Sequence, residues 1–423
     1  MFRWDKATFV PALLAALTCS ALADGPSIDP TNMPRVGTVD ERFQSYNIEM
    51  VEVTGGRFWK PYGPEPTTAG TDLYAYRPPI DLNNIKLRRL AAALAPAYLR
   101  VSGTWANSTY FSDTDNAPPA PPAGFNGVMT RRQWQGVVNF SQAVDAKLVT
   151  SFAVSSGARD AAGVWTPDQA RRLLAYTGFL GGSIAAAEFM NEPDLPAIGG
   201  APAGYDAAAY GRDFKIFRSF VKQTAPEMMV LGPGAAGQAP LASDLLAASG
   251  PGVDVFSYHH YGTLSERCIG SSTPDAALSE SWLAQTGRAL GFHRTLRNEF
   301  EPGKPIWLTE TADAACGGNR WSATFLDTFR YLDQLGRLAK AGVQVVMHNT
   351  LAASDYGLLD ERTLAPRPNY WGALLWRRLM GAIVLDSAVP IDQGFMFTPI
   401  ASAASRAVSL FCLSIRTAPR PGR

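Results

Sequence analysis

The chain has 423 residues, of which 46% are hydrophobic and 18% are charged, and its formal net charge is +1. This length allows one large domain with an extensive core and a smaller flanking unit. A net charge so close to zero gives no electrostatic reason to expect nucleic acid or an anionic membrane surface as a partner.

The first 23 residues have the pattern of a signal peptide. Arg3 and Lys6 precede an apolar stretch over residues 7–17, and Ala21-Leu22-Ala23 offers a small-residue cleavage site. The apolar stretch is too short for an integral membrane span. We therefore expect an exported protein, periplasmic or extracellular, with a mature chain that begins after residue 23.

Between residues 45 and 385, strand-like and helix-like segments alternate. The strand-like segments are short and apolar, as expected for strands buried on both faces. They are Tyr46–Val53, Tyr98–Ser102, Leu148–Val154, Ile184–Met190, Met228–Gly232, Val253–Tyr258, Ile306–Thr309 and Val343–His348. Helical spacing of apolar residues occurs between them, for example over Leu82–Leu94, Pro167–Phe179 and Ala323–Ala341.

Eight such strands interleaved with helices predict an α/β protein with a (β/α)8 TIM barrel at residues 45–385. An open, doubly wound sheet is the alternative, and it fits less well because no glycine-rich phosphate turn follows the first strand. Residues 24–44 show little pattern and could add one strand to an accessory sheet. Residues 386–423 are too short for a β-sandwich, although Ser402–Cys412 could form a strand.

Export would expose the cysteines to oxidation. Cys268, Cys316 and Cys412 remain after removal of the signal peptide, so at least one of them lacks an intrachain partner. Cys268 and Cys316 each follow a predicted strand end by several residues, and a disulfide between them is feasible if those strands are neighbours. No cysteine–histidine spacing suggests a metal site.

Two glutamates occupy matched positions at predicted strand ends. Glu192 follows the fourth strand in Asn191-Glu192-Pro193, and Glu310 follows the seventh in Leu308-Thr309-Glu310. Barrel enzymes carry their chemistry at the C-terminal ends of the strands. A pair of carboxylates about 5–5.5 Å apart can hydrolyse a glycosidic bond with retention, one as acid and one as nucleophile. Glu192 suits the acid role, because Asn191 beside it can contact the sugar 2-hydroxyl, and Glu310 suits the nucleophile.

A histidine–tyrosine run ends the sixth predicted strand, at Tyr258-His259-His260-Tyr261. A single buried histidine is usually structural, but two adjacent ones between tyrosines at a strand end are harder to explain that way. The sixth strand should lie next to the seventh, so His259 or Tyr261 could hydrogen-bond to Glu310 and orient it.

From about Phe43 to Leu385 the chain resembles the heparanase-like glycoside hydrolases of family 79. An ordered set of motifs carries this resemblance: residues 98–104 (YLRVSGT), 188–193 (EFMNEP), 258–261 (YHHY), 307–311 (WLTET), and 356–360 leading into Asn369-Tyr370-Trp371. The resemblance implies retaining cleavage of β-linked glucuronic acid, with no cofactor. It also implies that Glu192 is the acid/base and that Glu310 is the nucleophile, supported by Tyr261.

The same resemblance implies a set of substrate contacts. Asn191 would contact the 2-hydroxyl, and Glu49 and Thr104 would grip sugar hydroxyls. Gly317, Gly318 and Tyr356 would accept the substrate carboxylate through backbone N–H groups and a phenol, which a backbone nest can do without a buried arginine.

The chain departs from the family in two ways. The β-sandwich that family members usually carry is nearly absent at the C-terminal end, so residues 386–423 resemble a vestigial or truncated remnant of it. Basic and acidic residues are also nearly equal in number, so the sequence shows no excess of positive charge for the basic cleft expected of an enzyme that binds sulfated chains. The favoured hypothesis is therefore an exo-acting β-glucuronidase. An endo-acting, heparanase-type hydrolase of glucuronic-acid-containing polysaccharide and a non-catalytic glycan-binding protein are the alternatives, and the sequence does not indicate an oligomeric state.

Overall fold

A computed structural model describes residues 33–63, 73–114, 116–237 and 240–386, together with the short strand segments 395–397, 400–401, 408–409 and 412–414. The predicted signal peptide lies outside the described residues, and so does most of the strand predicted over Ser402–Cys412.

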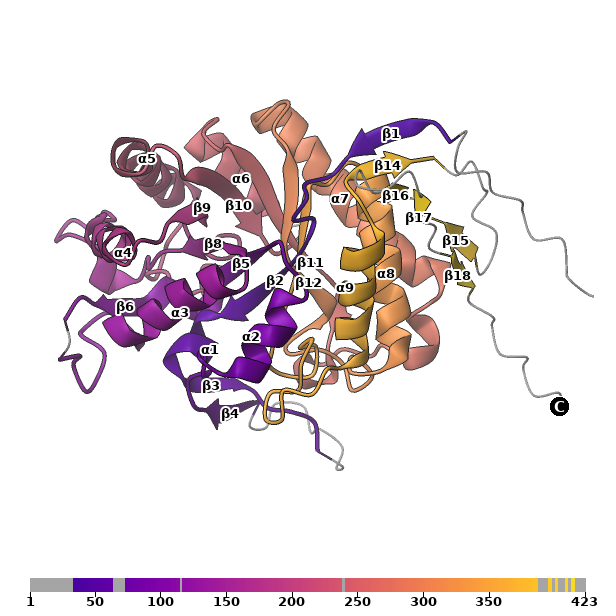
Figure 1. Ribbon diagram of the computed structural model, residues 1–423. Helices are drawn as coiled ribbons and strands as arrows, with labels where there is room; N and C mark the ends of the chain where they lie inside the picture. The colour runs from indigo at the N-terminus through magenta and orange to yellow at the C-terminus, as the bar shows by residue number, and fades with distance from the viewer. Residues whose placement is uncertain are drawn as a thin grey trace, which may run out of the picture.

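Eight parallel strands close into a barrel, which confirms the predicted (β/α)8 fold (Figure 1). They are β2 (Gln44–Glu49), β5 (Ala97–Ser102), β8 (Ala146–Ser151), β9 (Ile184–Glu188), β10 (Met229–Ala235), β11 (Val255–Leu264), β12 (Ile306–Ala315) and β13 (Val345–His348). Each strand pairs with the next in this order, and β13 closes the ring by pairing with β2. The first and the fourth strands, β2 and β9, therefore lie on different sides of the barrel mouth.

Helices cover the outside of the barrel (Figure 1). They are α2 (Ile85–Ala92), α3 (Arg131–Ala143), α4 (Asp168–Phe179), α5 (Ala207–Thr224), α6 (Pro240–Ser249), α7 (Glu280–Phe300), α8 (Phe325–Lys340) and α9 (Pro368–Leu379). Several begin at side-chain caps that satisfy the first free backbone N–H groups. Thr130 and Gln133 form a capping box at α3, and the Asp206 carboxylate accepts from the N–H of Ala209 at α5. None of the described helices is both long and apolar enough to cross a membrane.

The strand bounds differ from the predicted ones at two functionally important places. The first predicted strand, Tyr46–Val53, is β2 followed by the short helix α1 (Met50–Thr54). The sixth and seventh strands run further than predicted, to Leu264 and Ala315, because β11 and β12 continue to pair with each other beyond the barrel. This extension places Glu310 inside β12 rather than after its end.

The core has two layers. The barrel interior is filled by a cluster that includes Tyr98, Val149, Leu231, Trp307 and Met347, with the Tyr98 and Trp307 rings 4.7 Å apart. A larger apolar cluster lies between the strands and the helices. Bulky side chains that fill the barrel at this level form a solid floor, so chemistry is confined to the C-terminal face.

Small sheets decorate both ends of the barrel. The hairpin of β3 (Gly56–Trp59) and β4 (Tyr74–Arg77) follows α1, and β6 (Thr109–Ser112) pairs with β7 (Gly127–Thr130). A four-stranded sheet joins β1 (Arg35–Thr38) with β14 (Ile383–Leu385), β16 (Ile400–Ala401) and β17 (Val408–Ser409), and β15 (Phe395–Phe397) pairs with β18 (Cys412–Ser414). Figure 1 shows the β1–β14 sheet at the upper right and the β3–β4 hairpin at the lower edge.

Candidate active site

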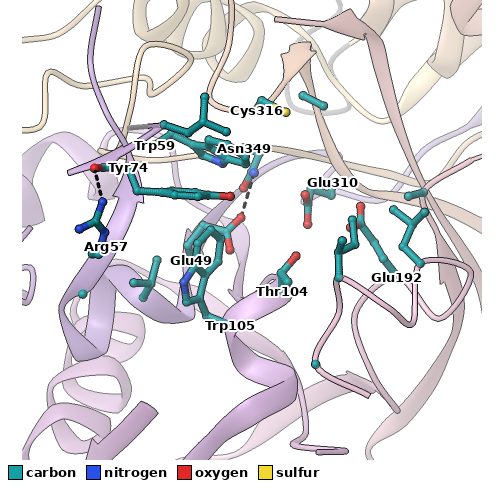
Figure 2. Close-up of a pocket in the computed structure, with 18 of the residues that line it drawn as sticks. Glu49, Arg57, Trp59, Tyr74, Thr104, Trp105, Glu192, Glu310, Cys316 and Asn349 are labelled. Atoms are coloured by element: carbon teal, nitrogen blue, oxygen red, sulfur yellow. Dashed lines mark hydrogen bonds between the residues drawn. The ribbon is translucent and has the colours of Figure 1, made fainter. Parts of the chain in front are cut away.

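A cleft of about 1080 Å³ opens at the C-terminal ends of the barrel strands. Glu192 and Glu310 line it, as do four of the residues for which the resemblance implied a contact with the substrate or the nucleophile: Glu49, Thr104, Tyr261 and Tyr356. Figure 2 shows Glu192 at one side, Glu310 next to it, and Glu49 and Asn349 further along. The fold thus brings together carboxylates from the first, fourth and seventh barrel strands.

Local backbone irregularities present the two glutamates to the cleft. Glu192 follows β9 and has a φ of +47°, a left-handed conformation that is uncommon for a residue with a side chain. In β12 the pairing with β11 skips Thr309, so that Leu308 is opposite Tyr258 and Glu310 is opposite His259. A bulge of this kind re-aims a side chain, and bulges are frequent beside active sites.

A buried arginine connects most of the site. Arg100 on β5 donates to Oε2 of Glu310 at 2.8 Å, to Oε2 of Glu188 at 2.8 Å, and to Oδ1 of Asn191 at 2.7 Å. Glu188, the last residue of β9, also accepts from the hydroxyls of Ser257 and Thr309. Both Arg100 and Glu188 are at most 1% exposed. Sequence reasoning assigned neither of them a role, although a charged residue in the middle of an apolar strand is a signal that could have indicated one.

The environments of the two cleft glutamates push their pKa values in opposite directions. Burial raises the pKa of Glu192, and the neighbouring charge of Glu310 raises it further, although the contact with His259 opposes this. Burial also opposes ionisation of Glu310, but the positive charges of His259 and Arg100 and the hydrogen bond from Tyr261 bring its pKa below the usual value. The two pKa values are therefore shifted apart, in the directions that a general acid and a nucleophile require.

His259 and Tyr261 hold the two glutamates in different ways. The Tyr261 hydroxyl donates to Oε1 of Glu310 at 2.6 Å. Nδ1 of His259 lies 3.0 Å from Oε1 of Glu192 and 3.7 Å from Oε2 of Glu310, so His259 sits between the two carboxylates. Asn191 is 1% exposed, and its backbone and side chain are fixed by Asn107 and Arg100.

Glu49, Asn349 and Tyr356 form a second polar group in the cleft. Nδ2 of Asn349 lies 3.0 Å from Oε1 of Glu49, 3.0 Å from the Tyr261 hydroxyl and 3.3 Å from the Tyr356 hydroxyl. Burial and the charge of Glu310 raise the pKa of Glu49 well above its usual value. Gly103 (φ +89°) makes room for this carboxyl, because a Cβ there would lie 1.5 Å from Oε2 of Glu49.

Gly317 and Gly318 lie in the loop after β12, beside the cleft, but they are not among the described residues that line it. Both have positive φ values, +83° and +87°. Side chains from outside the loop fix both carbonyls by hydrogen bonds. Ser354 donates to the carbonyl of Gly317, and Arg267 and Tyr62 donate to the carbonyl of Gly318. Cys316 directly before them forms a disulfide with Cys268, the pair for which the sequence suggested a bond.

The group of Glu192, His259 and Glu310 also has the donor types of a metal site, since one potential ligand atom from each lies within 4.8 Å of the others. The guanidinium of Arg100 already supplies a positive charge 2.8 Å from the Glu310 carboxylate. A second cation there would face repulsion from it. The acid–nucleophile arrangement accounts for the same three side chains without an ion.

Comparison with known proteins gives a consistent picture. The family model "Glycosyl hydrolase family 79, N-terminal domain" matches residues 78–336, more than half of the chain. Heparanase-like protein 1 of Arabidopsis thaliana is 28% identical over 331 residues, which cover 72% of this chain and 59% of that protein. Heparanase of Mus musculus is 28% identical (73% and 65% covered), and hyaluronoglucuronidase of Hirudo nipponia is 24% identical (77% and 72% covered). The chain thus spans well under two thirds of the length of the plant relative.

Solved structures share the barrel at low sequence identity. A 4-O-α-L-rhamnosyl-β-D-glucuronidase from Fusarium oxysporum superposes with a TM-score of 0.63 at 14% identity, covering 89% of this chain and 78% of that one. An α-L-arabinofuranosidase from Thermotoga maritima gives 0.62 at 14% identity, covering 88% and 81%. At this identity, the likeness shows the fold alone.

Proposed function

The chain belongs to glycosyl hydrolase family 79, and from this premise we propose that it is a retaining hydrolase of β-linked glucuronic acid. The observation that carries the proposal is the pair Glu192 and Glu310, with carboxylate oxygens within 4.8 Å of each other and pKa values shifted in opposite directions. Retaining enzymes place the two carboxyls about 5–5.5 Å apart, whereas inverting enzymes need about 6.5–9.5 Å to admit a water.

In the first step, a carboxylate oxygen of Glu310 attacks the anomeric carbon. The bond from that carbon to the leaving oxygen breaks, and the leaving oxygen takes the proton of Glu192. Arg100 and Tyr261 hold the attacking carboxylate in one orientation, at 2.8 and 2.6 Å. The result is a glycosyl ester on Glu310 and an ionised Glu192.

In the second step, Glu192 acts as a base. It takes a proton from water, the water oxygen bonds to the anomeric carbon, and the ester bond to Glu310 breaks. Glu192 is then protonated again and Glu310 is again a carboxylate. His259 lies between the two groups. The charges of Glu310 and Glu192 raise its pKa even though burial opposes its protonation, so its imidazolium can offset whichever of the two carboxylates is ionised.

Recognition of the glucuronic acid carboxylate is assigned to the side of the cleft formed by Tyr356 and the Gly317–Gly318 loop. Tyr356 lines the cleft, and burial and nearby carboxylates raise its pKa well above 10, so its hydroxyl stays a hydrogen-bond donor. The anchored glycine loop beside it supplies backbone N–H groups at positive φ, a conformation that forms anion-binding nests.

The described residues that line the cleft include three acidic side chains, Glu49, Glu192 and Glu310, and a single basic one, Arg57. For this reason we favour exo-cleavage of terminal glucuronides. An endo-acting hydrolase is the second candidate. It is supported by the length of the cleft, which continues from Leu195 and Ile198 on the Glu192 side to the β3–β4 hairpin. Export to an oxidising compartment is part of the proposal, and the Cys268–Cys316 disulfide is consistent with it.

Hydrolysis of 4-nitrophenyl β-D-glucuronide, compared with the matching glucoside, tests the proposal. We expect turnover of the glucuronide alone, its loss in Glu310→Ala, and wild-type turnover in Glu227→Ala, an exposed glutamate outside the cleft. The NMR spectrum of the first-formed sugar should show the β-anomer. An α-anomer would exclude the retaining mechanism, and folded wild type that cleaves no glucuronide would contradict the proposed function.

A further inference from the structure

The turn that carries Glu192 is held from two sides by buried polar side chains to which the proposed chemistry gives no part. Asn107, in the 3-10 turn Thr104–Ser108 after β5, holds the residue before Glu192, and Asp194 holds the chain after it. We propose that Asn107 and Asp194 are positioning residues for the general acid, which fix this turn so that the Glu192 carboxyl points at the leaving oxygen. The inference rests on the proposed function and concerns the same site.

Asn107 pairs with both backbone groups of Asn191. Its Oδ1 accepts from the N–H of Asn191 at 2.8 Å, and its Nδ2 donates to the carbonyl of Asn191 at 2.8 Å. A carboxamide carries one acceptor and a donor, as a peptide group does, so it can take the place of a neighbouring strand in this pairing. Both residues are buried, and without Asn107 these two backbone groups would lose their partners away from water.

This pairing controls the direction of the Glu192 side chain. The carbonyl of Asn191 and the nitrogen of Glu192 belong to one planar peptide group, so the bond from Asn107 fixes the plane from which Glu192 departs. Glu192 has a φ of +47°, and a residue with a side chain keeps such a conformation only where its surroundings impose it. Without Asn107, we expect the turn to relax and the carboxyl to leave its place 3.0 Å from Nδ1 of His259.

Asn107 is itself fixed by the backbone of another loop. Its carbonyl accepts from the N–H groups of Val154 and Ser155, at 2.8 and 3.0 Å, in the segment that follows β8. The segments after β5, β8 and β9, three successive barrel strands, therefore meet at this one residue. An asparagine held in this way can transmit its position to the turn of the acid.

Asp194 holds the other side of the turn. The N–H of Leu195 donates to the carbonyl of Glu192 at 3.0 Å, which closes the turn. The Asp194 carboxylate then accepts from the N–H groups of Ala236 and Gly237, at 2.9 and 3.0 Å, in the segment after β10. Hydrogen bonds from backbone N–H groups to a carboxylate are stronger than those between neutral groups. The turn is therefore tied to its neighbours in both directions around the barrel mouth.

A displaced acid would weaken the reaction in a recognisable way. A general acid matters most when the leaving oxygen is strongly basic, and it matters little when the leaving group is stable as an anion. The value of kcat/KM reports the steps up to departure of the leaving group. A misdirected Glu192 should therefore lower kcat/KM for a poor leaving group and spare a good one, whereas a damaged fold or nucleophile lowers both.

Phenyl β-D-glucuronide and 2,4-dinitrophenyl β-D-glucuronide, a poor and a good leaving group, test the proposal. For Asn107→Ala we expect kcat/KM to fall about 100-fold with the phenyl compound and less than about threefold with the dinitrophenyl compound. Asn107→Asp keeps the acceptor for the backbone N–H and should lose less. Asp194→Asn replaces one of two acceptor oxygens and should show the same selectivity, with about a tenfold loss for the phenyl compound.

Asn369→Ala is the matched control. Asn369 is also a buried asparagine, but it bonds Asp327 and Thr328 at the start of α9, away from the Glu192 turn. This variant should change kcat/KM for the two compounds by the same factor. Equal losses for both compounds in Asn107→Ala would indicate a structural role and would overturn the proposal. If that variant does not fold, Asn107→Asp and Asp194→Asn decide the question by the same criterion.

Failure of the proposed function would look different, because folded wild type would then cleave neither glucuronide. A ¹³C NMR titration of the Glu192 carboxyl still tests the positioning role in that case. Burial raises the pKa of Glu192, the contact with His259 lowers it, and the charges of Glu310 and Asp194 raise it. In Asn107→Ala the pKa should fall toward its usual value as the carboxyl meets water, and in the control variant it should not. An unchanged pKa in Asn107→Ala would overturn the proposal.

Discussion

The hydroxyl of Tyr261 is the hydrogen-bond donor closest to Glu310, at 2.6 Å, and it also accepts from Asn349 at 3.0 Å. It connects the proposed nucleophile to the Glu49 and Tyr356 group on the other side of the cleft. The hydrogen bond favours the ionised form of Glu310. Its removal should therefore make the carboxylate both less well oriented and harder to ionise.

We expect Tyr261→Phe to lower kcat for a glucuronide about 10- to 100-fold, because a hydrogen bond to a charged group contributes about 1.5–3 kcal/mol. The acid limb of kcat/KM against pH should move to higher pH, because the pKa of Glu310 rises without this donor. Tyr258→Phe is the control: its buried hydroxyl on the same strand has no hydrogen-bond partner among the described residues. An unchanged acid limb in Tyr261→Phe would show that the hydroxyl does not tune Glu310.

The sequence allowed prediction of the two cleft glutamates and of the Tyr261 contact with Glu310, but not of the roles of the buried Arg100 and Glu188. Glu192 and Glu310 follow apolar runs, so the sequence alone indicates their positions at the strand ends. The partners of Arg100, Glu188 and Glu310, are 88 and 210 positions further along the chain. Only closure of the barrel brings them together, and no local pattern records that contact.

Among the elements, the loops after β11 and β12 are held together by Arg267. Its guanidinium donates to the carbonyls of Lys60, Cys316 and Gly318, pairs with Asp355, and lies over the Tyr62 ring at 3.7 Å. The side chain is 2% exposed. Arg267 therefore positions the glycine loop that we assign to carboxylate recognition, without lining the cleft itself.

Arg267→Ala should raise KM for the glucuronide about tenfold, because it removes a buried ion pair and several hydrogen bonds. Arg267→Lys should restore part of the loss, because it keeps some of these interactions. The preference for glucuronide over glucoside should fall in parallel. Arg288→Ala, an exposed arginine on α7, is the control. If thermal stability falls while the preference is kept, Arg267 has only a structural role.

The Cys268–Cys316 disulfide joins the same two loops, and the two cysteines have a sequence separation of 48. A bond that closes a loop of this size typically stabilises a fold by about 2–4 kcal/mol. We expect the Cys268→Ser, Cys316→Ser double variant to unfold at a lower denaturant concentration, and a reducing agent to have the same effect on the wild type alone. Equal midpoints for oxidised wild type and double variant would contradict this.

Element boundaries were least predictable where the backbone pairing of two strands continues beyond the apolar sequence pattern. The seventh strand was predicted to end at Thr309, because Glu310, Thr311 and Asp313 are polar. In the structure it continues to Ala315, since its backbone keeps its partners on β11. Tertiary pairing therefore decides the length of this strand, and side-chain polarity decides which residues face the cleft.

Across the whole molecule, two sets of buried titratable groups change the free energy of unfolding in opposite directions as pH changes. Burial and the charge of Asp327 raise the pKa of Asp313 from 3.8 to about 7, and burial raises that of Glu52 to about 7. Burial lowers the pKa of His293 from 6.5 to about 3 and that of His348 to about 4. The carboxyls bind a proton more tightly in the folded state, so their contribution falls as pH rises from about 4 to 7. The histidines bind it less tightly, so their contribution falls as pH drops below about 6.5.

Single substitutions should reveal these opposing slopes. In Asp313→Asn the amide can still accept from Asn319, as Oδ2 does now at 3.0 Å, while Arg330 and Ser322 remain beside it. Relative to wild type, the free energy of unfolding of this variant should rise by about 1–3 kcal/mol between pH 5 and pH 7.

His293→Phe should do the reverse. The ring stacks on Tyr258 at 4.6 Å, and Phe256 and Phe292 lie beside it. The charges of His260 and His259 also lower the pKa of His293. Relative to wild type, this variant should gain about 1–2 kcal/mol as pH falls from 6.5 to 5. Urea unfolding at pH 5, 6 and 7 measures both slopes. Curves for both variants that run parallel to the wild type would show that neither group changes its proton affinity on folding.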